Sequence, residues 1–250
     1  MFYSTKIGSQ SIKLEYDIWG KGKPILFLHG GGTDYHYYQS FIACLAKNYK
    51  VYSFSYPGFG KSANMKNYSL ENYLFLIDNF LLQMNLKDLA IVGHSMGAGL
   101  AAAYISNSVN KIKLALLISP FLYSYKKSIF KLASDLSRQG IIEKDYIPNY
   151  KNINTNQISL ILSKLNQLPK TLNLIKLYLF LTHTDINKYL SFEVPCIGII
   201  GKEDIVLNIK DQLQGLNKIK NIDIMEYDNF GHNVLFAKKY EILDKIKSLY

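Results

Sequence analysis

The sequence contains very little cysteine: Cys44 and Cys196 are the only two in 250 residues. Both stand in apolar stretches, so we expect buried free thiols and no disulfide framework. A chain without disulfides suits a reducing compartment, which predicts a cytoplasmic protein. No group of histidine, cysteine, aspartate and glutamate residues has the spacing of zinc ligands, and we expect neither a metal nor another cofactor.

Long apolar runs are missing as well. None approaches the roughly 18–20 residues of a membrane-spanning helix, and residues 1–6 lack the apolar core of a signal peptide. The apolar share of 48% is nevertheless that of a globular protein, and 250 residues are enough for one domain with an inserted subdomain.

Arginine is nearly absent, because Arg138 is the only one although the net charge is +10. Arginine makes the forked contacts to phosphate and guanine on which nucleic-acid surfaces depend, so its scarcity argues against a nucleic-acid-binding protein. The lysines are spread along the chain. They predict a solvated basic surface with at most weak attraction to anionic membranes.

What the chain does contain is an alternation of short apolar runs and helical patterns, up to residue 120 and again from residue 191. This alternation predicts an α/β fold: a mostly parallel eight-stranded sheet with helices on both faces. The expected strands are residues 2–7, 12–18, 24–28, 51–55, 89–92, 113–119, 194–200 and 222–227. The expected helices are residues 35–48, 69–84, one that begins after Ser95, 207–216 and 233–249.

Between residues 121 and 190 the pattern changes to helical segments with no convincing strand. We expect helices at residues 126–139, ended by Gly140, at 155–168, at 169–183 and a short one after Asp185. The sequence therefore predicts a helical cap, residues 121–190, inserted into a core made of residues 1–120 and 191–250.

The most informative stretch is Gly93-His94-Ser95-Met96-Gly97, which joins an apolar strand to a helix of small residues. The G-x-S-x-G pattern at such a turn is typical of a nucleophilic serine. Glycines two residues before and after the serine let neighbouring backbone pass closely, and the helix directs its first amides at the reacting centre. Ser95 is the predicted nucleophile, and the alternative is an incidental serine in a glycine-rich turn.

Five histidines are candidates for the base that takes the serine proton. Only His232 follows the last expected strand, which puts it at the same sheet edge as the nucleophile. His94 precedes the serine directly, so its side chain points elsewhere, and His29 is better explained as a structural residue that orders the glycine loop. His36 and His183 lie in helical segments and are expected at the surface or in the cap.

The acid that orients the histidine is expected in Gly201-Lys202-Glu203-Asp204, after the strand at 194–200. Asp204 is the preferred residue. Glu203 is the near alternative, and Asp228 is a weaker one because it lies close to His232 in sequence. Asp204 also has a simpler explanation as an ordinary turn or N-cap residue.

Backbone amides of Met96 and Gly31 are expected to form the oxyanion hole. The triple glycine at 30–32 lets its loop come close to a substrate carbonyl. The alternative is that these glycines form a flexible turn with no part in catalysis. Apolar and aromatic residues in the insertion and after this loop, among them Phe121 and Tyr35, predict a pocket wall for an apolar or aromatic group.

Five stretches together make the chain resemble the α/β-hydrolase family: His29-Gly30-Gly31-Gly32, Pro57-Gly58-Phe59-Gly60-Lys61-Ser62, Gly93-His94-Ser95-Met96-Gly97, Gly201-Lys202-Glu203-Asp204 and Gly231-His232. Their order, serine then acid then histidine, is that of the family. The resemblance implies the α/β-hydrolase fold, with residues 121–190 similar to the cap of lid-bearing members. One departure is Tyr56, where relatives often carry an aspartate; it concerns loop packing and leaves the triad in place.

A serine at this turn predicts acyl transfer through an acyl-enzyme, because relatives that open epoxides or displace halides use an aspartate there. The expected activity is that of a serine carboxylesterase or lipase-like hydrolase acting on a small apolar ester, since Gly-His-Ser-Met-Gly resembles the turn of monoacylglycerol lipases. The nearest alternative is an acyl thioesterase, followed by an aminopeptidase or a carbon–carbon hydrolase. A ligand receptor on the same fold is the non-enzymatic alternative, and the sequence predicts no oligomeric state.

Overall fold

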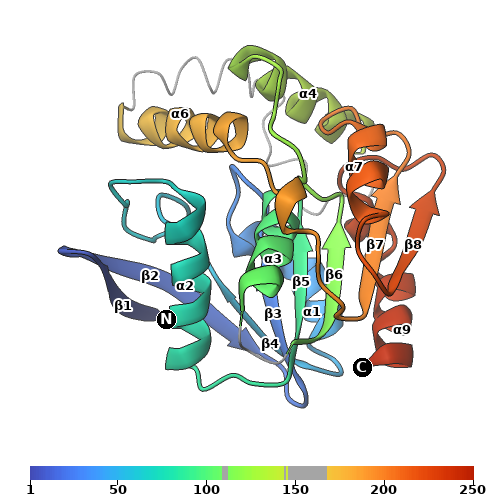
Figure 1. Cartoon of the computed structure of the whole chain (residues 1–250), viewed down its shortest axis with the longest axis horizontal. Coiled ribbons are helices and arrows are strands. Elements are labelled where there is room, and N and C mark those ends of the chain that lie inside the picture. Colours follow the sequence, from blue (N-terminus) through green and yellow to red (C-terminus); the bar gives the residue numbers. More distant parts are fainter. Residues whose placement is uncertain (109–111, 144, 146–167) are drawn as a thin grey trace.

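The computed structural model describes residues 1–108, 112–143, 145 and 168–250. Within these residues eight strands form one sheet in the order β1-β2-β4-β3-β5-β6-β7-β8 (Figure 1). The strands are β1 (Phe2–Ile7), β2 (Gln10–Trp19), β3 (Pro24–Leu28), β4 (Lys50–Phe54), β5 (Leu89–His94), β6 (Ile112–Ile118), β7 (Cys196–Gly201) and β8 (Ile222–Tyr227). β2 pairs antiparallel with β1 and β4, and all other neighbours are parallel. The predicted mostly parallel eight-stranded sheet is confirmed.

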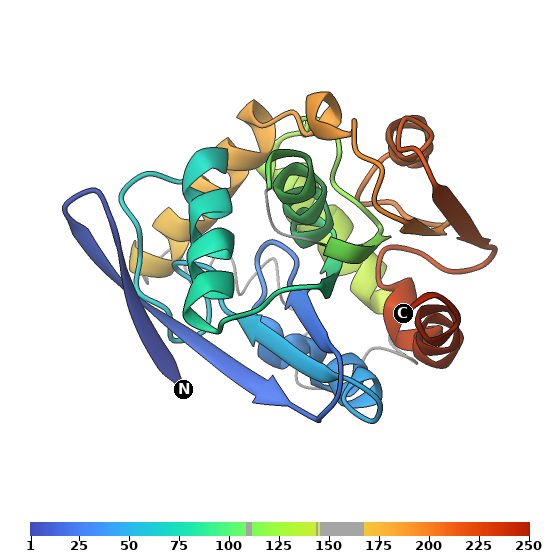
Figure 2. The ribbon, with the colours of Figure 1, turned by 60° about the horizontal axis from the view of Figure 1, so that its bottom comes forward.

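Helices cover both faces of this sheet (Figures 1 and 2). One face carries α2 (Leu70–Gln83), α3 (Met96–Asn107) and α7 (Ile209–Leu216). The opposite face carries α1 (Gln39–Leu45), preceded by the 3-10 helix η1 (Tyr35–Tyr38), together with α8 (Val234–Ala237) and α9 (Lys239–Leu249). The single helix expected at 233–249 is thus two helices, which meet at Lys238.

The central strands are apolar throughout because they are buried on both faces. In β5, Leu89 and Ile91 belong to the hydrophobic cluster beneath α2 and α3, whereas Ala90 and Val92 belong to the cluster beneath α1 and α9. Alternate side chains of a strand point to opposite faces, so one apolar run supplies both cores.

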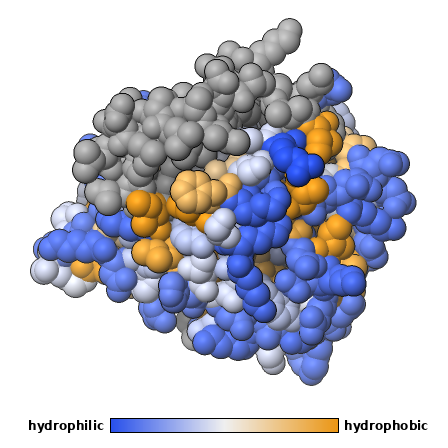
Figure 3. Space-filling view, turned by 90° about the horizontal axis from the view of Figure 1, so that it is seen from above, coloured by the Kyte–Doolittle hydropathy of each residue, from blue (hydrophilic) through white to orange (hydrophobic). Residues whose placement is uncertain are grey.

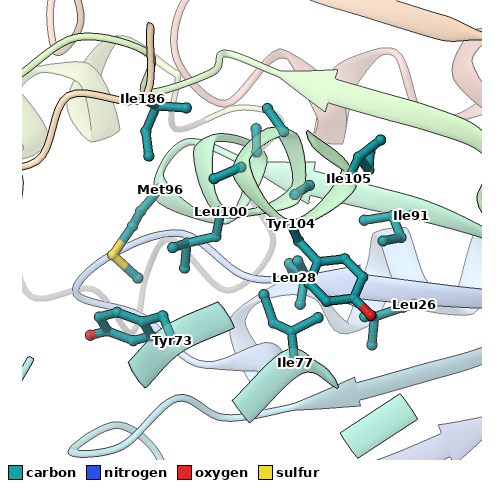
Figure 4. Close-up of a cluster of buried hydrophobic side chains, with 14 of the residues drawn as sticks. Leu26, Leu28, Tyr73, Ile77, Ile91, Met96, Leu100, Tyr104, Ile105 and Ile186 are labelled. Carbon is teal, nitrogen blue, oxygen red and sulfur yellow. The ribbon is translucent and has the colours of Figure 1, made fainter. Parts of the chain in front are cut away.

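The first of these clusters fixes α3, the helix that follows the turn at Ser95. Figure 4 shows Leu100 and Tyr104 of α3 packed with Leu26 and Leu28 of β3 and with Ile77 of α2. Small residues along α3 let the helix lie close to the sheet. The start of α3 is therefore held rigidly at the carboxyl ends of β3 and β5.

Two further helices, α4 (Ile129–Ile142) and α6 (Leu168–His183), lie beyond the carboxyl ends of the strands (Figure 1), followed by the 3-10 helix η4 (Asn187–Tyr189). α4 begins after its N-cap Ser128 and continues past Gly140, because a helical glycine costs only about 1 kcal/mol and tertiary contacts outweigh it. The expected helix 155–168 lies, apart from Leu168, outside the described residues. The assignment of residues 121–190 as a cap stays a prediction.

The surface on this side is partly apolar (Figure 3). Phe130 and Ile142 of α4 and Leu179 of α6 have exposed fractions of 77%, 60% and 48%. None of the helices in the described part of the chain is both long and apolar enough to cross a membrane. Cys44 and Cys196 are free and buried, as the sequence predicts.

Candidate active site

Ser95 occupies the sharp turn between β5 and α3. Its φ and ψ are 54° and −118°, values that cost a residue with a Cβ atom about 1–3 kcal/mol. The turn is held by its neighbours, because the Ser95 amide donates to the carbonyl of Ile118 at 2.9 Å and its carbonyl accepts from the Phe121 amide at 3.1 Å. The surrounding sheet thus enforces the strain.

The two glycines of the pattern are required by close backbone contacts. A Cβ atom on Gly93 would lie 2.4 Å from the carbonyl oxygen of Gly97, and one on Gly97 would lie 2.2 Å from that of Leu28. Such distances exclude any side chain at either position. Gly97 therefore lets the turn press against β3, and Gly93 lets the start of α3 lie close to the end of β5.

The glycine loop after β3 packs directly on this turn. A Cβ atom placed on Gly30 would be 3.4 Å from the Cβ of Ser95, and one on Gly31 would be 3.5 Å from the sulfur of Met96. The loop is held by Thr33, whose hydroxyl donates to the Gly30 carbonyl at 2.9 Å. The structure therefore places Gly30 against Ser95, and it brings the two predicted oxyanion residues, Gly31 and Met96, together beside the turn.

His232 and Asp204 form a buried pair. Nδ1 of His232 lies 2.8 Å from Oδ2 of Asp204, and the two residues are 3% and 6% exposed. Oδ2 also accepts from the Gln212 side-chain amide at 3.0 Å, while Oδ1 accepts from the backbone amides of Val206 and Leu207 at 2.9 and 3.0 Å. Asp204 thus closes a turn, as the simpler explanation requires, and orients the histidine as well.

The two pKa values of this pair move apart. Burial by itself raises the pKa of Asp204, but the adjacent His232 ring and the hydrogen bonds from Leu207 and Gln212 outweigh burial and hold this pKa below its ordinary value. Burial by itself lowers the pKa of His232, but the charge of Asp204, their hydrogen bond and the charge of Glu143 outweigh it and raise this pKa. The environment therefore stabilises a protonated His232 beside an ionised Asp204.

The two alternative acids do not reach the histidine. Glu203 is exposed, and its backbone amide donates to the carbonyl of Phe230 at 2.8 Å. Asp228 has a 76% exposed side chain and pairs with Lys202 at 3.0 Å. Of the three acids considered from sequence, the structure brings only Asp204 to His232.

The His94 ring makes its hydrogen bonds with Tyr38 and with His232, the predicted base. Its Nε2 lies 2.8 Å from the carbonyl oxygen of His232, and its Nδ1 lies 2.8 Å from the hydroxyl of Tyr38. Burial lowers the pKa of His94 to about 3, so the ring is neutral. Because a carbonyl only accepts, Nε2 carries the proton and the Tyr38 hydroxyl donates to Nδ1. The Ser119 hydroxyl donates to the same His232 carbonyl at 2.9 Å.

The sequence reasoning missed this support of His232. The available signal was a histidine at the end of a wholly apolar strand, because a buried imidazole needs hydrogen-bond partners. The partner residues, however, are far away in sequence.

His29 is the structural histidine that the sequence predicts. The ring is fully buried, its Nε2 accepts from the Tyr56 amide at 2.9 Å, and burial lowers its pKa to about 4. Tyr56 packs on the same ring with centroids 4.3 Å apart, so this departure from the family pattern does concern loop packing. His36 is partly exposed and pairs with Glu15 at 3.2 Å, and His183 is exposed at the end of α6.

The two predicted substrate-binding residues lie in different places. Phe121 contacts the Ser95 carbonyl through its amide and is 2% exposed. Tyr35 is 1% exposed and packs against Trp19, with ring centroids 5.4 Å apart, in the cluster on the α1 face. That cluster lies on the opposite side of the sheet from α3, so the structure does not bring Tyr35 to Ser95. Sequence reasoning also missed Leu177 of α6, whose Cδ1 would lie 3.2 Å from a Cβ atom on Gly31.

Known proteins resemble this chain along most of its length. A family model described as alpha/beta hydrolase fold matches residues 23–168. A Mycoplasma pneumoniae protein named "Putative esterase/lipase 2" is 26% identical over 246 residues, which cover 89% of this chain and 89% of that protein.

Solved structures share the fold. A bromoperoxidase from Bacillus anthracis matches with a TM-score of 0.77 and 20% identity, over 100% of this chain and 99% of that one. An esterase from Exiguobacterium antarcticum matches with a TM-score of 0.73 and 18% identity, over 95% of each chain. Because these two proteins differ in activity, the likeness in fold does not choose between reactions.

Proposed function

The chain belongs to the alpha/beta hydrolase fold family, and we propose that it is a serine hydrolase that cleaves a small apolar carboxylic ester through an acyl-enzyme on Ser95. The observation that carries the proposal is the hydrogen bond of 2.8 Å between His232 Nδ1 and Asp204 Oδ2. These residues follow β8 and β7, which run parallel to β5, so their loops share a sheet edge with Ser95. A nucleophile, a base and an orienting acid at one edge are what acyl transfer requires.

In the proposed reaction, Nε2 of His232 takes the proton of the Ser95 hydroxyl while the serine oxygen bonds to the ester carbonyl carbon. The amides of Gly31 and Met96 then donate to the tetrahedral oxyanion, and one such donor lowers the barrier by about 3–4 kcal/mol. As the carbon–oxygen bond of the ester breaks, His232 returns its proton to the departing alcohol. Asp204 stabilises the imidazolium that exists between these two proton transfers.

Water completes the cycle. His232 takes a proton from a water molecule, whose oxygen bonds to the acyl carbon. The second tetrahedral oxyanion uses the same two amides. Its collapse breaks the bond to the serine oxygen, which recovers its proton from His232, and the carboxylic acid leaves.

The apolar character of the proposed substrate follows from the side chains next to the turn. Phe121 hydrogen-bonds to Ser95 through its backbone, and Leu177 packs over Gly31. Apolar side chains beside the turn favour an apolar acyl or alcohol group, as in a monoacylglycerol-like ester, over a sugar or a charged peptide.

The same residues are compatible with related reactions. A thioester reacts by the same steps with a thiol as the leaving group, and an aminopeptidase would release an amine. A carbon–carbon hydrolase would need a carbon leaving group, and a receptor would bind ligand with little turnover. The Mycoplasma pneumoniae relative named as an esterase/lipase favours the ester.

The proposal is tested with 4-nitrophenyl esters from acetate to palmitate. We expect turnover with a preference for apolar acyl groups, and its loss in both Ser95→Ala and His232→Ala. Ser248→Ala, which changes an exposed serine on α9, is the matched control and is expected to retain full turnover.

A fluorophosphonate probe separates the outcomes. Labelling of Ser95 without turnover of any ester would redirect the assignment to a thioesterase, peptidase or receptor. Folded protein in which Ser95 is neither labelled nor needed for turnover would contradict the proposal.

A further inference from the structure

Two buried polar side chains at the end of α4 make contacts that reach beyond the helix: Gln139 lies in its last turns, and Glu143 is its C-cap residue. Gln139 is 1% exposed and Glu143 is 0% exposed. They are four residues apart, so they lie on the same side of the helix. A buried carboxylate is costly unless its oxygens accept hydrogen bonds, so the partners of Glu143 indicate why it is there.

Glu143 binds the loop of His232 on both sides of the histidine. Its Oε1 accepts from the Gly231 amide at 3.0 Å, and its Oε2 accepts from the Asn233 side-chain amide at 2.7 Å. Both oxygens also lie 3.3 Å from the Asn233 backbone nitrogen. The residues directly before and after His232 are therefore attached to one carboxylate.

Gln139 binds the loop of Asp204 in a similar way. Its Oε1 accepts from the Ile205 amide at 2.9 Å, and the Ile205 carbonyl accepts from the ammonium of Lys127 at 3.1 Å. The residue after Asp204 thus has both backbone groups bound by α4 and the segment that precedes it. A Cβ atom on Gly231 would come within 1.9 Å of Gln139 Nε2, so the glutamine also packs against the histidine loop.

We propose that Glu143 and Gln139 are positioning residues of the proposed hydrolase, which hold the loops of Asp204 and His232 to helix α4. The inference rests on the proposed function and extends it, because α4 belongs to the segment predicted as a cap. The two loops otherwise meet through the side chains of Asp204 and His232, with loop contacts such as that of the Glu203 amide to Phe230. The contacts of α4 add to those that His94 and Ser119 make to the His232 carbonyl and that Gln212 makes to Asp204.

The kinetic test compares variants within α4. We expect Glu143→Ala to lower kcat roughly 10- to 100-fold with little change in KM, because the base is misplaced while the substrate site is intact. Gln139→Ala is expected to have a smaller effect of the same kind. Arg138→Gln is the matched control, because it changes the charge of the same helix by one unit at an exposed position and is expected to leave kcat unchanged.

A second readout separates positioning from plain stability. The charges that act on the His232 ring are those of Asp204 after β7 and Glu143 at the end of α4. The neutral ring of His94 in β5 also faces it, with ring centroids 4.9 Å apart. Glu143→Gln keeps an oxygen acceptor and removes the charge. We expect the His232 ring, followed by NMR, to titrate at lower pH in this variant than in wild type and in Arg138→Gln, and the acid limb of kcat/KM to move the same way.

The proposal is overturned if the Glu143 variants have a lower Tm but an unchanged kcat per folded molecule and an unchanged His232 titration. If Glu143→Ala does not fold, the Glu143→Gln titration and the kinetics of Gln139→Ala decide the question. The NMR titration needs no turnover. A wild-type protein inactive on every ester would therefore contradict the proposed function without deciding the role of Glu143.

Discussion

Nε2 of His94 donates to the backbone carbonyl of His232 across 2.8 Å, so the residue before the proposed nucleophile holds the backbone of the proposed base. The contact extends further, because the Tyr38 hydroxyl donates to His94 Nδ1 and accepts from the Gly30 amide at 3.1 Å. One chain of hydrogen bonds therefore runs from the glycine loop, past Ser95, to the loop of His232.

Interrupting this chain of hydrogen bonds should lower both the stability of the fold and the rate of ester hydrolysis. We expect His94→Leu to lower the free energy of unfolding by about 1–3 kcal/mol, since it leaves a buried hydroxyl without its acceptor. Tyr38→Phe removes only the hydroxyl and is expected to cost about 1 kcal/mol. Urea unfolding and ester kinetics measure both effects. Variants as stable and as active as wild type would show that this chain of hydrogen bonds contributes neither to stability nor to activity.

The raised pKa of His232 fixes the direction of the pH dependence. The base must be neutral to accept the serine proton, and Asp204 holds its pKa above the ordinary value of 6.5. The acid limb of kcat/KM is therefore expected at an apparent pKa above 6.5, with activity rising towards alkaline pH. A pH profile on a neutral ester measures it. A limb below that value would mean that the Asp204 charge does not act on the base.

The same pair predicts how stability depends on pH. The raised pKa of His232 stabilises the fold below its ordinary value of 6.5, and this contribution is lost as pH rises through the folded pKa. The lowered pKa of Asp204 stabilises the fold above its ordinary value of 3.8, and this contribution is lost as pH falls through the folded pKa. The pair is thus most stabilising between these two ordinary values.

Asp204→Asn should accordingly lose more stability in mildly acidic than in alkaline solution. We expect a loss of about 1–3 kcal/mol near the middle of that window and a smaller one well above it. Unfolding curves at both pH values, with Asp228→Asn as an exposed control, measure the difference. An equal loss at both would mean that the pair is not ionised in the folded protein.

The backbone of Ser95 predicts an inactive but more stable variant. Its φ of 54° suits glycine, so Ser95→Gly is expected to raise the free energy of unfolding by about 1 kcal/mol relative to Ser95→Ala, which keeps a Cβ atom. Both variants should be inactive. Thermal unfolding distinguishes them. An alanine variant as stable as the glycine variant would contradict the inference that the backbone at residue 95 is strained.

The fold was predictable from sequence because each central strand is a short apolar run between turn residues, a local pattern that needs no knowledge of its neighbours. The end of α4 was not, since Gly140 is an ordinary stop signal that contacts elsewhere override. Tyr35 follows the glycine loop like a pocket residue, yet it packs on the far face of the sheet, and only the tertiary arrangement determines which face.

The candidate site divides in the same way. Ser95, Asp204 and His232 stand at strand ends, and strand order converts these positions into proximity. The residues that hold these three in place do not stand at positions that strand order predicts. Glu143 and Asn233, or His94 and His232, are separated by 90 and 138 residues, and no periodicity relates them.

The strand order also determines in which order the parts of the site can assemble during synthesis. β3, β5 and β6 lie next to one another and leave the ribosome before β7 and β8, which add in turn at one edge of the sheet. N-terminal segments begin to fold while later ones are still being made. The nascent chain therefore gathers the serine and its glycine loop first and receives the acid and the histidine later, so that the proposed reactivity is withheld until the loop of His232 has left the ribosome.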